Sequence, residues 1–273
     1  MNARIFRRPV LLIGAVITLA LLAVALMSLI WTPLPPSQMN IVQRLKPPLD
    51  AGLLGTDQFG RDIASMLMVG AWNSLSISFA AVAIGAFAGT VVGTTAAMWR
   101  GLFELCVMRL CDIVFAVPPI LSAMVLGAFI GAGRFTVVIA IGVFMVPVFA
   151  RLTLAAARQI WARDYVTAAV GIGRSKSKIT LFHILPNIAN QIIVQVAIQL
   201  GLAILTEAGL SFLGLGLSPP APSWGRMLAD SQTFFGQAPW LAILPGLAIA
   251  LAVLGLNMLG DGLRDMLDPR NNT

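Results

Sequence analysis

Few side chains in this 273-residue chain belong to the types that perform covalent or metal chemistry. His183 is the only histidine, which excludes a histidine-based metal cluster and argues against a Ser/His hydrolytic site. Cys106 and Cys111 are the only cysteines, and their i, i+5 spacing fits neither a zinc pattern nor a disulfide framework. The chain also has no GxxxxGK[ST] loop to cradle ATP. We therefore predict no catalytic residue, no metal site and no cofactor bound by this chain.

Three amide side chains offer non-covalent chemistry instead. Gln191, Gln195 and Gln199 follow one another at four-residue spacing within an apolar stretch. At about 100° per residue they stay within about 80° of one another on an α-helix. Amides that face lipid leave hydrogen bonds unmade, so these three should face a neighbouring helix or an aqueous path. Lining of a pathway and hydrogen bonding between helices both remain open.

The composition places these residues in a membrane. The chain is 58% hydrophobic and only 11% charged, with a mean hydropathy of +0.90, whereas soluble domains carry about a quarter of charged residues. A net charge of +7 would suit nucleic acid if it were clustered on a soluble surface. Here the basic residues lie between apolar stretches, so we expect an all-α polytopic membrane protein surrounded by lipid, with no nucleic-acid partner.

Six apolar stretches predict six transmembrane helices, because a helix needs about 20 residues to cross a bilayer. They cover residues 9–31, 75–98, 113–133, 135–150, 188–210 and 240–259. The first is too long for the apolar region of a signal peptide, about 7 to 15 residues, so we interpret it as a retained span. The expected organisation is a tail and first span (1–31), an extracytoplasmic segment (32–70), a membrane core (71–265) with loops at 151–187 and 211–239, and a cytoplasmic tail (266–273).

The basic residues set the orientation. With the N-terminus inside, 13 of the 18 Lys and Arg residues fall in inside segments, as the positive-inside rule requires. The inside residues are Arg4, Arg7, Arg8, Arg100, Arg109, Arg151, Arg158, Arg163, Arg174, Lys176, Lys178, Arg264 and Arg270. Six spans then place both termini in the cytoplasm. Two arginines are expected to form local ion pairs inside, Arg109 with Asp112, and Arg264 with Asp261 and Asp268.

Small residues mark one face of the second span. Gly85, Gly89 and Gly93 recur every four residues, with Ala81 and Ala97 in the same register. Small residues at this spacing allow another helix to approach closely. We expect a helix contact there, within the chain or with a sister subunit.

The loop at residues 151–187, called the coupling loop below, contains a short amphipathic helix. Asp164 is a candidate N-cap and Gly173 a candidate left-handed stop. Tyr165, Ala168, Ala169 and Ile172 between them fall at i, i+3, i+4 and i+7 and give one apolar face. Helices shorter than about 12 to 15 residues are marginal alone in water, so this face must dock against something.

The same loop resembles the "EAA" loop of binding-protein-dependent ABC importer permeases. The similarity lies in Thr167-Ala168-Ala169, in Gly173 and in His183-Ile184-Leu185-Pro186-Asn187, with Thr167 standing where many members have Glu. In that family the loop forms a cytoplasmic coupling helix that sits in a cleft of the ATPase subunit. The resemblance implies that residues 164–173, His183 and Pro186 serve ATPase coupling.

Further stretches are similar to the dipeptide, oligopeptide and nickel branch of that family, from about Leu53 to Arg270. These stretches are Leu54-Gly55-Thr56-Asp57 with Gly60-Arg61-Asp62, Glu207 to Gly216 with Pro222-Ser223-Trp224-Gly225, Gly260 to Asp265 with Leu267-Asp268-Pro269-Arg270, and Met108-Arg109 with Asp112 and Pro118. Glu104 stands where many relatives have Asp.

This resemblance implies a type I permease fold in a bacterial inner membrane, as the second permease subunit of a heterodimer. The implied partners are a homologous permease, two ATP-binding subunits that hold ATP and Mg²⁺, and an extracytoplasmic solute-binding protein. The chain would form half of a pathway for di- or oligopeptides or a related small solute.

Two rival functions are testable. An ion-coupled secondary transporter should carry carboxylates near mid-membrane, but every Asp and Glu falls in a loop or near a span end. An intramembrane enzyme needs a base near its nucleophile, and His183 is expected at the inside surface.

Overall fold

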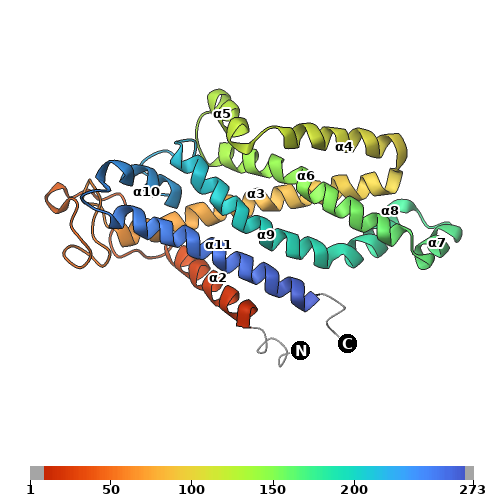
Figure 1. Cartoon of the computed structure of the whole chain (residues 1–273), viewed down its shortest axis with the longest axis horizontal. Helices are drawn as coiled ribbons and strands as arrows, with labels where there is room; N and C mark the ends of the chain where they lie inside the picture. The colour runs from red at the N-terminus through yellow and green to blue at the C-terminus, as the bar shows by residue number, and fades with distance from the viewer. Residues whose placement is uncertain (1–8, 268–273) are drawn as a thin grey trace.

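The computed structural model describes residues 9–267, which fold into an elongated bundle of helices (Figure 1). Its α-helices are α2 (Pro9–Met27), α3 (Ile63–Trp99), α4 (Gly101–Ala116), α5 (Pro119–Ile130), α6 (Arg134–Trp161), α7 (Asp164–Gly171), α8 (Lys176–Ile179), α9 (Leu185–Phe212), α10 (Trp224–Ser231) and α11 (Trp240–Leu267). Short 3₁₀ turns lie at Ile41–Gln43 (η1) and Gln232–Phe234 (η3), and a π turn at Thr180–Ile184 (η2). Residues 1–8 and 268–273, with Arg4, Arg7, Arg8, Asp268 and Arg270, lie outside the described residues.

The structure contains five to six candidate membrane spans, a range that includes the predicted six. Within residues 9–267, α2, α3, α6, α9 with the turns before it, and α11 are long and apolar enough to cross a membrane. The pair α4 and α5 supplies a sixth span if it is counted as one, although it bends by 83°. The bend falls at Pro118 and Pro119, which cannot donate backbone hydrogen bonds to the preceding turn.

The helices extend well beyond the predicted spans. The second helix begins at Ile63 within the segment assigned to the outside, α6 continues to Trp161, and α11 continues to Leu267. The third span begins as α4 at Gly101 rather than at Ile113. An α-helix satisfies its own backbone groups in lipid and in water alike, so the apolar run marks the part in the membrane and not the end of the helix.

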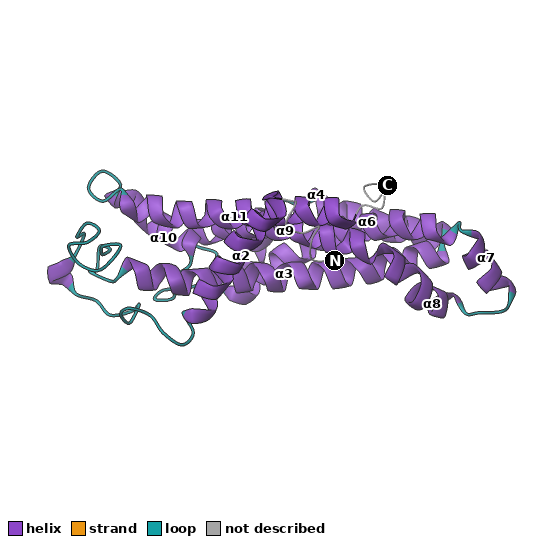
Figure 2. Cartoon of the chain, turned by 90° about the horizontal axis from the view of Figure 1, so that it is seen from below, coloured by secondary structure: helices purple, strands orange, loops and turns teal. Residues whose placement is uncertain are grey.

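The bundle has two distinct ends. The short helices α7 and α8 lie at one end of the bundle, called the α7 end. The coil before α3 lies with α10 at the other end, called the α10 end (Figures 1 and 2). Helix α3 runs along the bundle against α6 and α9, while α2 packs on α11. The buried core between them contains Ile77, Ile141, Phe149 and Ile204.

The glycines of α3 form a close contact with α6. A Cβ atom at Gly89 would lie 2.5 Å from the carbonyl oxygen of Val146 and 2.6 Å from the Cβ atom of Phe149. Gly85 faces Met145 and Gly93 faces Thr153 in the same way. The predicted helix contact therefore lies within the chain, because only glycine lets the two backbones meet here.

The coil before α3 is tied down by buried polar groups. Asp57 and Arg61 form an ion pair at 2.6 Å, and both are at most 6% exposed. Asp62 caps α3 by accepting a hydrogen bond from the backbone N–H of Ser65 at 2.8 Å. Gly55 and Gly60 adopt φ values of +81° and +72°, so both predicted turns need glycine.

A second polar cluster holds α10 against the bundle. Asn73 of α3 donates from Nδ2 to the carbonyl oxygen of Pro222 at 2.7 Å, and Arg134 of α6 donates to Oδ1 of Asn73 at 2.7 Å. The backbone N–H of Trp224 donates to Oγ of Ser74 at 3.3 Å, and its indole Nε1 donates to the carbonyl oxygen of Leu67 at 3.2 Å. The predicted loop at 211–239 is therefore anchored to the bundle at its centre.

Candidate functional site

Helix α7 starts one residue earlier than predicted. Asp164 was expected to be the N-cap, but it is the first helical residue, and Arg163 occupies the cap position without a side-chain hydrogen bond. The carboxylate still belongs to the first turn, where it favours the positive end of the helix dipole. The carbonyl oxygen of Arg163 accepts the first two helical bonds, from Val166 at 3.0 Å and Thr167 at 3.1 Å.

The end of α7 is formed as predicted. Gly173 has a φ of +81°, and its N–H donates to the carbonyl oxygen of Val170 at 2.9 Å. The N–H of Arg174 donates to the carbonyl oxygen of Ala169 at 3.1 Å. These two bonds constitute a Schellman motif, which requires a left-handed residue at Gly173.

The predicted apolar face divides into two. Val166 and Ala169 are buried against the neighbouring helix ends, in a cluster that includes Ala97, Leu154 and Ile184. Ala169 is therefore not on the outer face, which is a correction to the predicted stripe. Tyr165, Ala168 and Ile172 point away from the bundle and are exposed. Ile172 is 83% exposed, so an apolar outer face remains available on α7.

His183 braces the other side of the coupling loop. Its Nε2 lies 3.2 Å from a guanidinium nitrogen of Arg174, and its ring is edge-on to that of Tyr165 with centroids 6.3 Å apart. Pro186 is exposed near the start of α9, and the π turn η2 directly precedes that helix. Pro186 lacks an N–H for the preceding turn, while Leu185 donates to Thr180 across the wider π spacing.

Salt bridges fasten α4 to α6 near this end. Arg109 reaches Asp112 at 3.5 Å, as predicted, and Arg151 of α6 reaches the same carboxylate at 2.6 Å. Arg158 pairs with Glu104, about two α4 turns nearer the coupling loop. The basic residues at the start of the coupling loop thus belong to a continuous helix and fix its neighbour.

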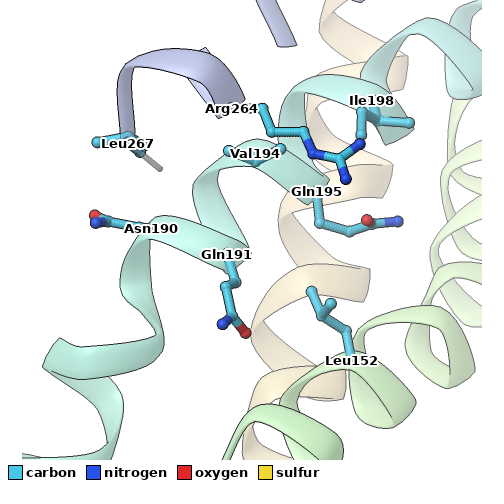
Figure 3. A pocket seen from close by; sticks show the side chains of 8 residues that line it. All are labelled: Leu152, Asn190, Gln191, Val194, Gln195, Ile198, Arg264 and Leu267. Atoms are coloured by element: carbon cyan, nitrogen blue, oxygen red, sulfur yellow. The ribbon is translucent and has the colours of Figure 1, made fainter. Parts of the chain in front are cut away.

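The glutamines of α9 separate into two environments. Gln191 and Gln195 line a cavity of about 450 Å³, the α9 cavity, and extend towards Leu152 of α6 (Figure 3). Gln199 is 5% exposed and lies outside its lining. The described residues that line the α9 cavity are Leu152, Asn190, Gln191, Val194, Gln195, Ile198, Arg264 and Leu267.

Two polar residues of the α9 cavity were not anticipated. Asn190 precedes Gln191 in sequence, and its polarity within an apolar helix was an available signal. Arg264 comes from α11, and its guanidinium reaches towards Gln195 (Figure 3). It forms no ion pair with Asp261 within residues 9–267, so that predicted pair is wrong, while Asp268 lies outside the described residues.

Glu207 lies near the outer end of α9, as expected, but it is fully buried. Its carboxylate accepts a hydrogen bond from Oγ of Ser211 at 2.6 Å. Cys106 is exposed on α4 and Cys111 is buried, and both are free thiols. Within residues 9–267, no group of three or more His, Cys, Asp and Glu side chains is placed to hold a metal ion.

Comparison with known proteins supplies the context for this geometry. Residues 81–273 match the family described as "Binding-protein-dependent transport system inner membrane component". The chain is 38% identical to the dipeptide transport system permease protein DppC of Alkalihalophilus pseudofirmus over 95% of its own length and 85% of the relative's. It is 38% identical to the glutathione transport system permease protein GsiD of Pectobacterium atrosepticum over 98% and 89% of the two chains.

A solved structure shares the fold. A chain from the inward-facing MetNI methionine ABC transporter superposes with a TM-score of 0.64 at 17% sequence identity, covering 74% of this chain and 96% of that one. The relatives are named as transport permeases and not as enzymes, in agreement with the prediction that this chain catalyses no reaction. The chain therefore belongs to the binding-protein-dependent transport system inner membrane components, the multi-pass permeases of ABC importers.

Proposed function

We propose that this protein is one of two different permease subunits in an ATP-driven importer of short peptides or related solutes such as glutathione. The relatives named as dipeptide and glutathione permeases support this solute class. Two ATPase subunits, which hold ATP and Mg²⁺, would dock at the α7 end. A solute-binding protein would approach the α10 end. Both termini would be cytoplasmic, as the positions of the basic residues favour.

The outer face of α7 carries this proposal. Tyr165, Ala168 and Ile172 form an exposed apolar strip, although the helix is held firmly by its inner residues and its Schellman motif. A helix fixed to the bundle on one side and apolar on the other fits a hydrophobic groove on a partner. When ATP closes the ATPase pair, α7 would move with its groove and switch the pathway between its two openings.

A movement of α7 would be transmitted to the membrane through the ends of α3, α6 and α9. The inner residues Val166 and Ala169 pack in the same cluster as Ala97 of α3, Leu154 of α6 and Ile184, which adjoins α9. A displacement of α7 therefore acts on three membrane helices at once, because packed interiors transmit strain.

Replacing Ala168 with Glu tests the coupling role. The substitution adds a charge to the outer strip without touching the buried face. We expect the subunit to insert normally, while ATP-dependent uptake in proteoliposomes falls at least about tenfold as the charge is buried in the groove. The matched control is Thr167→Glu, which adds the same charge one residue away, where relatives of this family often carry Glu. Normal uptake by Ala168→Glu would refute the coupling role.

Gln191 and Gln195 are proposed to line the pathway. Cysteines at these positions should react with water-soluble thiol reagents faster than a cysteine at Leu202, one turn beyond the α9 cavity. Val194 and Ile198 line the same cavity and are therefore unsuitable controls. Gln199 is buried and is assigned to helix contact instead. Equal reaction rates at Gln195 and Leu202 would leave only the helix-contact role for the glutamines.

A further inference from the structure

The α9 cavity is formed where two packed helices separate. At Gly260, α11 touches α9 so closely that a Cβ atom would lie 3.3 Å from Cβ of Ala197. One turn further along α11, Arg264 and then Leu267 border the cavity, and Leu152 of α6 forms the facing wall. At about 450 Å³, its volume lies within the range of small-molecule sites, roughly 300 to 1,000 Å³.

The polar groups of the cavity are complementary to a particular kind of molecule. Arg264 supplies a permanent positive charge and the planar donors that pair with a carboxylate. Among the described residues lining the cavity it is the charged one, and no described carboxylate forms an ion pair with it. Gln191 and Gln195 each offer both a donor and an acceptor, which suits a peptide bond.

The apolar groups limit what can fill the remaining space. Val194, Ile198, Leu152 and Leu267 surround the polar groups. They offer contact for small apolar side chains. A molecule with a carboxylate at one end, a peptide bond beside it and a short apolar side chain would meet each part of the lining.

We propose that the α9 cavity is a solute-binding site at the α7 side of the pathway, where Arg264 binds a carboxylate and Gln191 and Gln195 bind the adjoining peptide group. This proposal rests on the proposed function and adds a residue that selects anionic or zwitterionic peptides. A phospholipid phosphate would also pair with Arg264, so the experiment includes a lipid competitor.

Protection of a cavity thiol tests the site directly. The complete transporter, with both permeases and both ATPases, is placed in phosphatidylcholine nanodiscs after all native cysteines, including Cys106 and Cys111, are replaced by Ala. The rate at which Ile198→Cys reacts with a charged maleimide is then measured with alanyl-alanine, S-methylglutathione or alanyl-alanine amide. We expect the two carboxylate-bearing probes to slow the reaction, and the amide to do so only at about tenfold higher concentration.

Variants of Arg264 assign the effect to its side chain. Arg264→Gln should abolish protection, whereas Arg264→Lys should retain it at about tenfold higher probe concentration, because lysine keeps the charge but loses the fork of donors. A cysteine at Leu202, outside the cavity, should react at the same rate in every variant and so reports that the helices are intact. Equal protection by the amide, or unchanged protection in Arg264→Gln, would overturn the proposal.

The lipid alternative and the proposed function are separated by two further measurements. Protection by added phosphatidylglycerol and not by the peptides would assign the cavity to lipid and overturn the proposal. ATP-dependent uptake by the wild-type transporter is measured in parallel. Uptake without peptide protection overturns the solute site alone, whereas uptake that needs no ATPase overturns the proposed function.

Discussion

Both ends of the bundle contain buried apolar clusters, but the α10 end adds buried polar bonds. At the α10 end, irregular backbone is held by buried polar side chains: Asp57 with Arg61, Asn73 with Arg134, and Ser74 with Trp224. At the α7 end, a short helix is held by Val166 and Ala169 in an apolar cluster. The polar bonds specify one geometry, while the apolar contact leaves the outer face of α7 free for a partner. We infer that the α10 end is preformed and that the α7 end receives the mechanical input.

Replacing Asp57 with Ala should lower the free energy of unfolding by the largest amount, because it breaks a buried ion pair of the α10 end. The change leaves Arg61 buried without its partner and removes the acceptor of the N–H groups of Phe59 and Arg61. We expect the free energy of unfolding to fall by about 3 to 5 kcal/mol. The change should appear as a lower midpoint of thermal unfolding in detergent. The control Arg109→Ala removes an exposed salt bridge and should cost under about 1 kcal/mol. Equal losses for the two variants would mean that the α10 end is not specified by its buried polar groups.

Replacing Gly89 with Ala tests the contact that joins the two ends. The added methyl group meets the backbone of α6, so we expect a cost of about 1 to 3 kcal/mol in the same unfolding measurement. Gly209 lies on α9, and a Cβ atom there would meet nothing within 4 Å. Gly209→Ala should therefore be neutral or stabilising by up to about 1 kcal/mol. If both variants behave alike, α3 and α6 do not touch as described.

Replacing Asn73 with Ala should release α10 while the helices stay packed. Pro222 then loses its hydrogen bond and Arg134 loses one of its partners, at a cost of about 1 to 3 kcal/mol. We expect faster proteolysis within residues 218–231 and weaker stimulation of ATPase activity by the solute-binding protein. Asn187→Ala, which removes a local bond to His183 at the α7 end, is the control and should leave proteolysis of this segment unchanged.

Replacing Gly173 with Ala should have the smallest effect. The left-handed conformation costs a residue with a Cβ atom about 1 kcal/mol, and no other atom obstructs it. Because α7 is short, we expect a measurable fall in uptake with little change in the unfolding midpoint. Gly171→Ala, within the helix, should preserve uptake because alanine favours helix. A large drop in the unfolding midpoint of Gly173→Ala would show that the α7 end contributes more to stability than its contacts indicate.

The sequence was most informative where the physics is local. The stop at Gly173, the turns at Gly55 and Gly60, and the break at Pro118 depend on backbone conformations that single residues impose. The number of spans also follows from apolar runs of sufficient length. The glycine spacing of α3 predicted a contact but not its partner, because the pattern on one helix does not specify the surface that it meets.

What could not be predicted depends on contacts between distant segments. Ala169 and Ala168 are equally apolar, and only the position of the neighbouring helix ends decides which one is buried. Arg264 lies 69 positions after Gln195 in the numbering of the chain, yet both line one cavity. The hydrogen bond that holds the segment before α10 against α3 likewise joins Asn73 to Pro222. No periodicity within a single stretch reveals such pairs.

The glycine contact between α3 and α6 has a mechanical consequence. Where long side chains separate two helices, they can change rotamer when one helix moves, so the other helix need not follow. Gly85, Gly89 and Gly93 have no side chain that could change rotamer, and α6 lies directly against them. The two helices should therefore move together, so that a displacement at one face of the membrane also shifts the opposite face.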